Sequence, residues 1–148
     1  MKIILLVVLA VIVGCTSVPI PNYIKADHPY TRKISGDYDK IMTAIESVLS
    51  QEGWPIQDQL NPAVFERHPG GEDQSKDVLF FTAIKQHPKF FYSTYTHLNI
   101  FVHAIAEGAE VEIRYGSLTP LPVKQLQGTR NDPLANRLLD KIEQELSE

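Results

Sequence analysis

The sequence has a single cysteine, Cys15, among 148 residues. A chain with one cysteine cannot form an intramolecular disulfide, so its fold depends on its hydrophobic core alone. It also lacks an excess of positive charge, because 14 Lys and Arg against 18 Asp and Glu give a net charge of −4. This acidic balance, without a basic patch, argues against a nucleic-acid partner. The longest apolar run is also shorter than the about 20 residues that a transmembrane helix needs.

The N-terminus has the pattern of a secretion signal. Lys2 supplies a positive charge, residues 3–13 are all apolar, and the run ends in Ile-Val-Gly-Cys at residues 12–15. A charged start, a short apolar core and a small-residue end are typical of a signal peptide. Residues 12–15 resemble the lipobox of bacterial lipoproteins, in which the cysteine is obligatory. The alternative is an ordinary signal peptide in which Cys15 is incidental.

The resemblance implies a lipid anchor on Cys15. In that family a diacylglyceryl group is added to the thiol, a peptidase cuts before the cysteine, and its new amino group is acylated, for example with palmitate. Several acyl chains together anchor a protein stably in a bilayer. The next residue is Thr16 where an Asp would imply retention in the inner membrane. The expected location is therefore the periplasmic face of the outer membrane, or the cell membrane if the host has only one.

The remaining chain divides into two parts. Residues 15–29 contain the acylated cysteine and three prolines, Pro19, Pro21 and Pro29, which favour an extended tether that could reach about 40 Å. Residues 30–148 are enough for one domain. We therefore expect a signal peptide over 1–14, a tether over 15–29 and a single domain over 30–148.

The apolar periodicity of the domain predicts an α+β fold. Both helices have one apolar stripe, so we expect them on one face of an antiparallel β-meander, in the order β-α-β-β-β-β-β-α. The predicted elements are a strand over 30–35, a helix over 37–52, a hairpin of 54–58 with 63–67, a central strand over 77–84, a hairpin of 98–104 with 110–115, and a last helix that begins at residues 131–133.

The second predicted hairpin has a defined register. A turn at residues 107–108 pairs Ala104 with Val111, Val102 with Ile113 and Ile100 with Tyr115, all on one apolar face. On the opposite face, His103 then lies across from Glu112 and Phe101 lies across from Arg114.

This order of elements, together with the lipobox, resembles small envelope lipoproteins with TBP-like or helix-grip-like domains, such as the C subunit of the outer-membrane β-barrel assembly machine. The matching segments are residues 38–54, 98–115 and 136–146. The resemblance implies the fold and the envelope setting. It assigns no functional residue, and the second domain of that subunit has no counterpart here.

No set of residues indicates catalysis. His97 and His103 would lie about 20 Å apart along one strand, too far to bind one metal ion. A His103–Glu112 pair lacks a nearby nucleophile, so we expect no enzyme activity, no metal and no cofactor. If both helices cover one face of the sheet, the other face exposes Phe101, Ile105, His103 and Arg114, which are our candidate contacts for a partner.

The predicted function is therefore a non-enzymatic binding or assembly role at the membrane, with an unidentified envelope protein as partner. One alternative is a periplasmic carrier with an apolar pocket between sheet and helices, of at least about 300 Å³. A hydrolase is a weaker alternative. The aromatic segment 89–95 is a further candidate contact surface, although its residues could equally enter the core.

Overall fold

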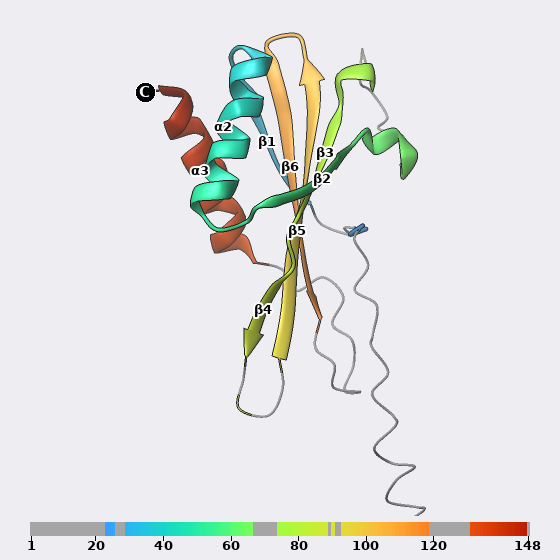
Figure 1. Ribbon diagram of the computed structural model, residues 1–148. Helices are drawn as coiled ribbons and strands as arrows, with labels where there is room; N and C mark the ends of the chain where they lie inside the picture. The colour runs from blue at the N-terminus through green and yellow to red at the C-terminus, as the bar shows by residue number, and fades with distance from the viewer. Residues whose placement is uncertain are drawn as a thin grey trace, which may run out of the picture.

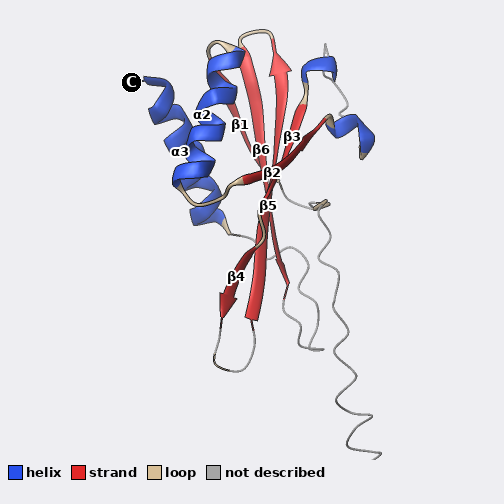
Figure 2. Cartoon of the chain, viewed as in Figure 1, coloured by secondary structure: helices blue, strands red, loops and turns tan. Residues whose placement is uncertain are grey.

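The structure, a computed structural model, describes residues 23–25, 29–66, 74–88, 90, 93–118 and 131–147. The predicted signal peptide and Cys15 lie outside these ranges. The described chain has the predicted α+β architecture and the predicted order β-α-β-β-β-β-β-α (Figure 2). Its elements are β1 Tyr30–Ser35, α2 Tyr38–Gln51, β2 Ile56–Leu60, β3 Val78–Thr82, β4 Lys85–Pro88, β5 Ser93–Ile105, β6 Gly108–Leu118 and α3 Asp132–Ser147, with 3-10 turns η1 Pro62–Val64 and η2 Gln74–Lys76.

The six strands form one antiparallel sheet. The strand order is β1-β6-β5-β3-β2, and β4 pairs with the first residues of β5 outside this path. Both helices pack on the same face of the sheet, as the two single apolar stripes predict (Figure 1). The opposite face carries no helix among the described residues.

Each helix begins with a side chain that caps its first turn. The carboxylate of Asp37 accepts a hydrogen bond from the backbone N–H of Lys40 at 3.0 Å, which satisfies an amide that the first turn of α2 leaves free. In the same way, the Asn131 side chain accepts one from the N–H of Leu134 at 3.3 Å at the start of α3. The predicted helix over 37–52 is confirmed to within one residue at each end.

The core lies between the helices and what we call the helix face of the sheet, formed by Leu98, Ile100, Val102, Ala109, Val111 and Ile113. Each of these side chains is at most 1% exposed. They contact apolar residues of both helices, including Ile41, Ile45 and Leu138. Burial of each large apolar side chain contributes about 1.5–3 kcal/mol, so this interface is the main source of stability.

The predicted register of the β5–β6 hairpin is wrong by two residues. In the structure Val102 pairs with Val111 and Ile100 with Ile113, because the turn consists of residues 106–107. A shift by two residues leaves every side chain on its predicted face, since side chains alternate with period two. The apolar pattern therefore cannot distinguish these two registers.

Gly108 explains the difference, because it belongs to the strand and not to the turn. It lies between Ile105 of β5 and Ser35 of β1. Its φ is +146°, and a Cβ at this position would lie 2.1 Å from the carbonyl oxygen of Ile34. Only glycine permits so close an approach of β1.

The predicted hairpin of 54–58 with 63–67 is also wrong. Residues 62–64 form the 3-10 turn η1, and β2 pairs instead with β3, for example Leu60 with Leu79. The Asn61 side chain caps η1 by accepting from the N–H of Ala63 at 2.8 Å, so Asn-Pro starts a helical turn here. The strand β4, which pairs with the start of β5, was not predicted.

Candidate functional site

The second face of the sheet is polar and yet buried. Its residues on β5 and β6 include Asn99, Phe101, His103, Glu112 and Arg114, and each is at most 7% exposed. We call it the strap face, because residues 23–25 (the strap) lie across it together with residues 65–66. Buried charges are costly unless they are paired, so the partners of these groups determine what the face can do.

Arg114 is the centre of this face. Its Nε donates a hydrogen bond to Glu112 on the same strand, and its Nη2 donates to Glu66 in the segment after β2. The guanidinium carbon lies 3.8 Å from the ring centroid of Phe101, a distance at which a cation is attracted by an aromatic ring. The guanidinium of Arg114 therefore binds two carboxylates and also lies over one aromatic ring.

The strap is bound to the sheet through Arg114 and its neighbours. Nη1 of Arg114 donates to the hydroxyl of Tyr23 at 3.2 Å and to the backbone carbonyl of Ile24 at 3.1 Å. The N–H of Ile24 donates to Oδ1 of Asn99 at 2.6 Å. The ring of Tyr23 stacks on Phe65 with centroids 4.7 Å apart. Tyr23 and Ile24, which lie in the tether predicted over 15–29, are thus packed against the domain.

These contacts shift the ionisation of the groups involved. Burial raises the pKa of Glu66, but hydrogen bonds from Arg114 and Tyr23 outweigh it, so the pKa lies below its usual value of 4.5. Burial lowers the pKa of Arg114, but the hydrogen bonds to Glu66 and Glu112 raise it overall. Burial is the main reason that the pKa of Tyr23 is raised. The ion pair between Arg114 and Glu66 is therefore fully charged at neutral pH.

A second polar pair lies beside this cluster. Nδ1 of His103 is 3.0 Å from the carboxylate of Asp77, and both side chains are at most 5% exposed. The same carboxylate accepts from the N–H of Ala104 at 3.2 Å. The predicted cross-strand neighbour of His103 is wrong, because the residue opposite is Glu110, and Glu112 lies opposite Phe101.

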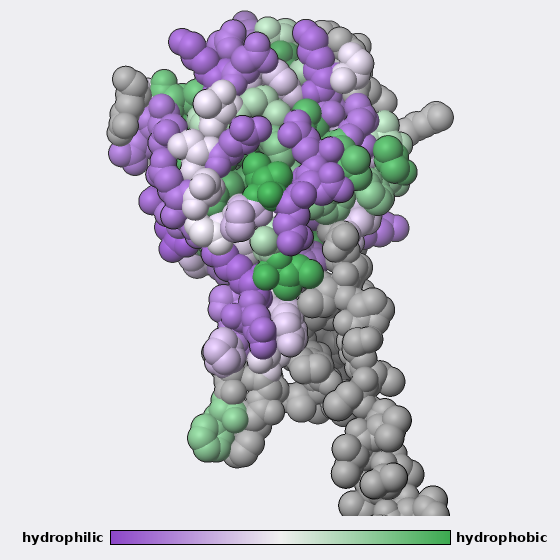
Figure 3. Space-filling view, in the orientation of Figure 1, coloured by the Kyte–Doolittle hydropathy of each residue, from purple (hydrophilic) through white to green (hydrophobic). Residues whose placement is uncertain are grey.

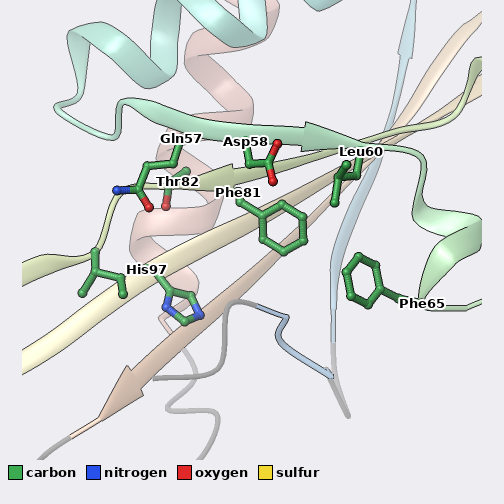
Figure 4. Close-up of a pocket in the computed structure, with 8 residues that line it drawn as sticks. Gln57, Asp58, Leu60, Phe65, Phe81, Thr82 and His97 are labelled. Atoms are coloured by element: carbon green, nitrogen blue, oxygen red, sulfur yellow. The ribbon is translucent and has the colours of Figure 1, made fainter. Parts of the chain in front are cut away.

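A small cavity of about 120 Å³ lies near the strap on the same face. Figure 4 shows Phe81, Leu60 and Phe65 around it, with His97 extending from β5 toward the same space. Nε2 of His97 is buried without a hydrogen bond in the described structure, and burial lowers the pKa of this imidazole. The cavity is smaller than the about 300 Å³ that small-molecule sites usually have.

Gly116 makes room for this histidine. It lies directly opposite His97 on β6, and a Cβ there would be 3.0 Å both from Nε2 of His97 and from a methyl carbon of Ile24. The imidazole and the strap therefore both rest on the backbone of Gly116.

The four candidate contact residues do not form an exposed surface. Phe101 is fully buried, His103 and Arg114 are 4% and 7% exposed, and only Ile105 is substantially exposed, at 38%. The expected uncovered face was wrong because the strap and the segment after β2 cover it. A role of these residues in partner binding stays a prediction, as does acylation of Cys15, which lies outside the described residues.

Three residues of this site were missed in the sequence: Tyr23, Glu66 and Asp77. Each comes from a different segment and contacts β5 or β6 from more than 25 positions away. No local pattern marks such pairs. Within the described ranges, no group of three or more His, Cys, Asp or Glu side chains is arranged to hold a metal ion.

Comparison with protein-family models and with curated proteins finds no match for this sequence. None of the helices in the described part of the chain has the length and apolarity to cross a bilayer.

Proposed function

We propose that this chain is a lipid-anchored envelope protein, held in the membrane through Cys15, whose domain binds another envelope component and has no enzymatic activity. The observation that carries the proposal is the tetrapeptide at residues 12–15, which places the only cysteine at the position that lipoproteins acylate. Thr16 after it favours the periplasmic face of the outer membrane in a host with two membranes.

The site geometry favours a structural role of these charged groups over a catalytic one. The charged groups of the strap face are bonded to one another: Arg114 to Glu66 and Glu112, and His103 to Asp77. Groups held in this way stabilise the fold and the strap.

A carrier of apolar ligands receives less support. The cavity near the strap has a volume of only about 120 Å³, and the larger hollow between α2 and α3, about 480 Å³, is lined mainly by polar side chains such as Asp39, Lys40 and Glu145.

The anchor is tested by Cys15→Ser in the full-length chain. We expect the variant to lose labelling by a fatty-acid probe and to be either left uncleaved or released from the membrane as soluble protein. Ser17→Ala is the matched control and should be labelled and retained as the wild type is. Equal processing and membrane retention of Cys15→Ser would refute the proposal.

The binding role is tested by crosslinking in the native envelope. A photoreactive side chain at Ile105, the exposed member of the candidate set, should capture one predominant protein that mass spectrometry identifies. Capture that persists unchanged when the domain is unfolded by mutation would be non-specific and would contradict a binding role for this surface.

A further inference from the structure

The strap is held to the sheet through its main chain. The N–H of Ile24 donates to Oδ1 of Asn99 at 2.6 Å, and its carbonyl oxygen accepts from Nη1 of Arg114 at 3.1 Å. Asn99 and Arg114 lie directly opposite each other on β5 and β6, so the two side chains bind both polar groups of one residue's main chain. Contacts of this kind hold a bound segment in place whatever side chain it has at that residue.

Tyr23 occupies a slot that fits both its ring and its hydroxyl group. The ring stacks on Phe65 with centroids 4.7 Å apart and meets Phe101 edge to face at 6.3 Å. The hydroxyl donates to Glu66 and accepts from Nη1 of Arg114 at 3.2 Å. A site that hydrogen-bonds a hydroxyl group discriminates against a ligand that lacks it, because polar groups of the site then lose a partner. The slot therefore favours tyrosine over phenylalanine.

The sheet does not need the strap to keep its buried charges paired. Without the strap, Arg114 would still donate to Glu112 on its own strand and to Glu66. A buried cation that keeps its carboxylates costs far less than one that loses them. Tyr23 and Ile24 are themselves only partly buried. The strap can therefore leave while the face beneath it remains folded.

The strap leaves part of its surroundings unfilled. The cavity of about 120 Å³ is lined by Phe65, which also stacks on Tyr23, and by His97, whose Nε2 has no hydrogen bond in the described structure. A cavity of roughly 150 Å³ can hold a benzene ring, so this one has room for one more apolar side chain. Apolar surface continues beside it over η1, where Val64 is 72% exposed, and Phe65 after it is 43% exposed (Figure 3). A longer segment can thus make contacts that the strap does not make.

We propose that the strap face is a binding site for a tyrosine-containing segment of a partner protein, and that the strap occupies this site until the segment displaces it. The strap itself shows which chemistry the site accepts. The partner's tyrosine takes the slot of Tyr23, its next residue binds Asn99 and Arg114 through the main chain, and a further apolar side chain fills the cavity. This additional contact lets the segment compete with a strap whose local concentration is high. The inference rests on the binding role proposed above and is independent of the anchor on Cys15.

The test measures binding of a tetrapeptide, Asn-Tyr-Ile-Lys, which has the sequence of residues 22–25, to the full-length protein in detergent. Tyr23→Ala removes the ring and the hydroxyl from the slot and leaves it open. Lys25→Ala is the matched control, because Lys25 is the exposed residue of the strap and its loss leaves the slot occupied. Titrations followed by NMR give the dissociation constant for each protein.

We expect the peptide to bind Tyr23→Ala at least about tenfold more tightly than the wild type or Lys25→Ala, since the strap competes only in those two. The signals of the Asn99 side-chain amide and of Arg114 Nε–H should shift on binding. A peptide with phenylalanine in place of tyrosine should bind at least about tenfold more weakly.

Three results would overturn the inference. The first is equal binding of the peptide to all three proteins, which would place it outside the slot. The second is no binding to Tyr23→Ala when thermal melts show that this variant is folded. The third is loss of folding in Tyr23→Ala, because the strap would then be a fixed part of the fold.

The role of the cavity is tested with longer peptides that carry leucine at one of the positions flanking Tyr-Ile. The peptide whose leucine reaches the cavity should bind Tyr23→Ala several-fold more tightly than the others. Adding Leu60→Trp, which narrows the cavity from its rim, should remove this gain alone. No gain at any position would refute displacement of the strap through the cavity.

Other outcomes separate this inference from its alternatives. Wild-type dimers that are lost in Tyr23→Ala would identify the occupant as the strap of a second copy and overturn the assignment to a partner protein. Capture at Ile105 without peptide binding would leave the proposed binding role intact and refute this inference alone. Peptide binding without capture at Ile105 would support the strap face as the binding surface in place of Ile105.

Discussion

The two faces of the sheet are both buried, but by different means. On the helix face, residues such as Val102, Val111 and Ile113 pack against apolar side chains of the two helices. On the strap face, Arg114 and Glu112 of β6 are covered by Tyr23 and Ile24 of the strap and by a short segment after β2. One face depends on area removed from water and the other on directional bonds between charged groups.

The two faces differ in how strictly they constrain the residues that cover them. Apolar burial is tolerant of partner identity, so any complementary apolar stripe can cover the helix face. A buried guanidinium requires specific acceptors at defined distances, and here they come from Tyr23, Ile24 and Glu66. The strap face is therefore the more specific of the two, and the more sensitive to loss of one partner.

The largest effect is expected on the helix face. Val102→Asp places an unpaired charge among side chains that are fully buried, and should reduce the free energy of unfolding by at least about 3 kcal/mol. Urea denaturation measures the change. Glu110→Gln is the control on the neighbouring strand: its carboxylate is 3.9 Å from the exposed Lys33, and such pairs contribute less than about 1 kcal/mol. Similar losses in both variants would contradict the burial of Val102 in the apolar core.

A somewhat smaller effect is expected from Arg114→Leu on the strap face. The change leaves Glu112, whose side chain is 9% exposed, without its cation, while Glu66 at 37% can still reach water. We expect a loss of about 3 kcal/mol, together with faster hydrogen exchange at the amide of Ile24.

The double variant Arg114→Leu with Glu112→Leu sharpens the comparison. It removes both the cation and the carboxylate that would be left unpaired, so it should be more stable than Arg114→Leu alone. A double variant that is as unstable as the sum of the two single changes would show that the ion pair itself, and not the unpaired charge, determines stability.

The sequence predicted the helix face better than the strap face. The period-two pattern assigned residues 98–104 and 110–115 to their correct faces, and the predicted helix starts lie within one residue of the observed ones. The register prediction was wrong because two registers that differ by two residues place the same side chains on the same faces. The contact that requires glycine at 108 comes from β1, which is distant in sequence. The predicted hairpin failed because the alternation does not specify which strand pairs with β2.

The strap could not be predicted for a related reason. Prolines near residues 19–29 favour an extended chain, and extended chains without regular hydrogen bonds look like tethers in a sequence. What binds Tyr23 and Ile24 to the sheet is the spatial cluster of Arg114, Asn99 and Phe65. This cluster exists only after β5 and β6 have paired, so no local signal precedes it.

The smallest effect concerns pH and tests whether the strap face depends on charge at all. The pKa of Glu66 is lowered mainly by hydrogen bonds from Arg114 and Tyr23, against the opposing effect of burial. A carboxyl group whose pKa is lower in the folded state stabilises the protein above its unfolded pKa, near 4.5, and this contribution is lost as pH falls through the folded value. Stability should therefore decline below about pH 4.5.

Glu66→Gln removes this contribution, so its stability should change less than that of the wild type between about pH 5 and pH 3. Because the Glu66 side chain is 37% exposed, water screens the ion pair and the difference is expected to be modest. Glu46→Gln, at an exposed position of α2, is the control and should retain the acid dependence of the wild type. Urea unfolding at a series of pH values measures all three proteins. If Glu66→Gln keeps the full acid dependence, then Glu66 contributes little as an anion, and the strap is held chiefly by the stacking of Tyr23 on Phe65.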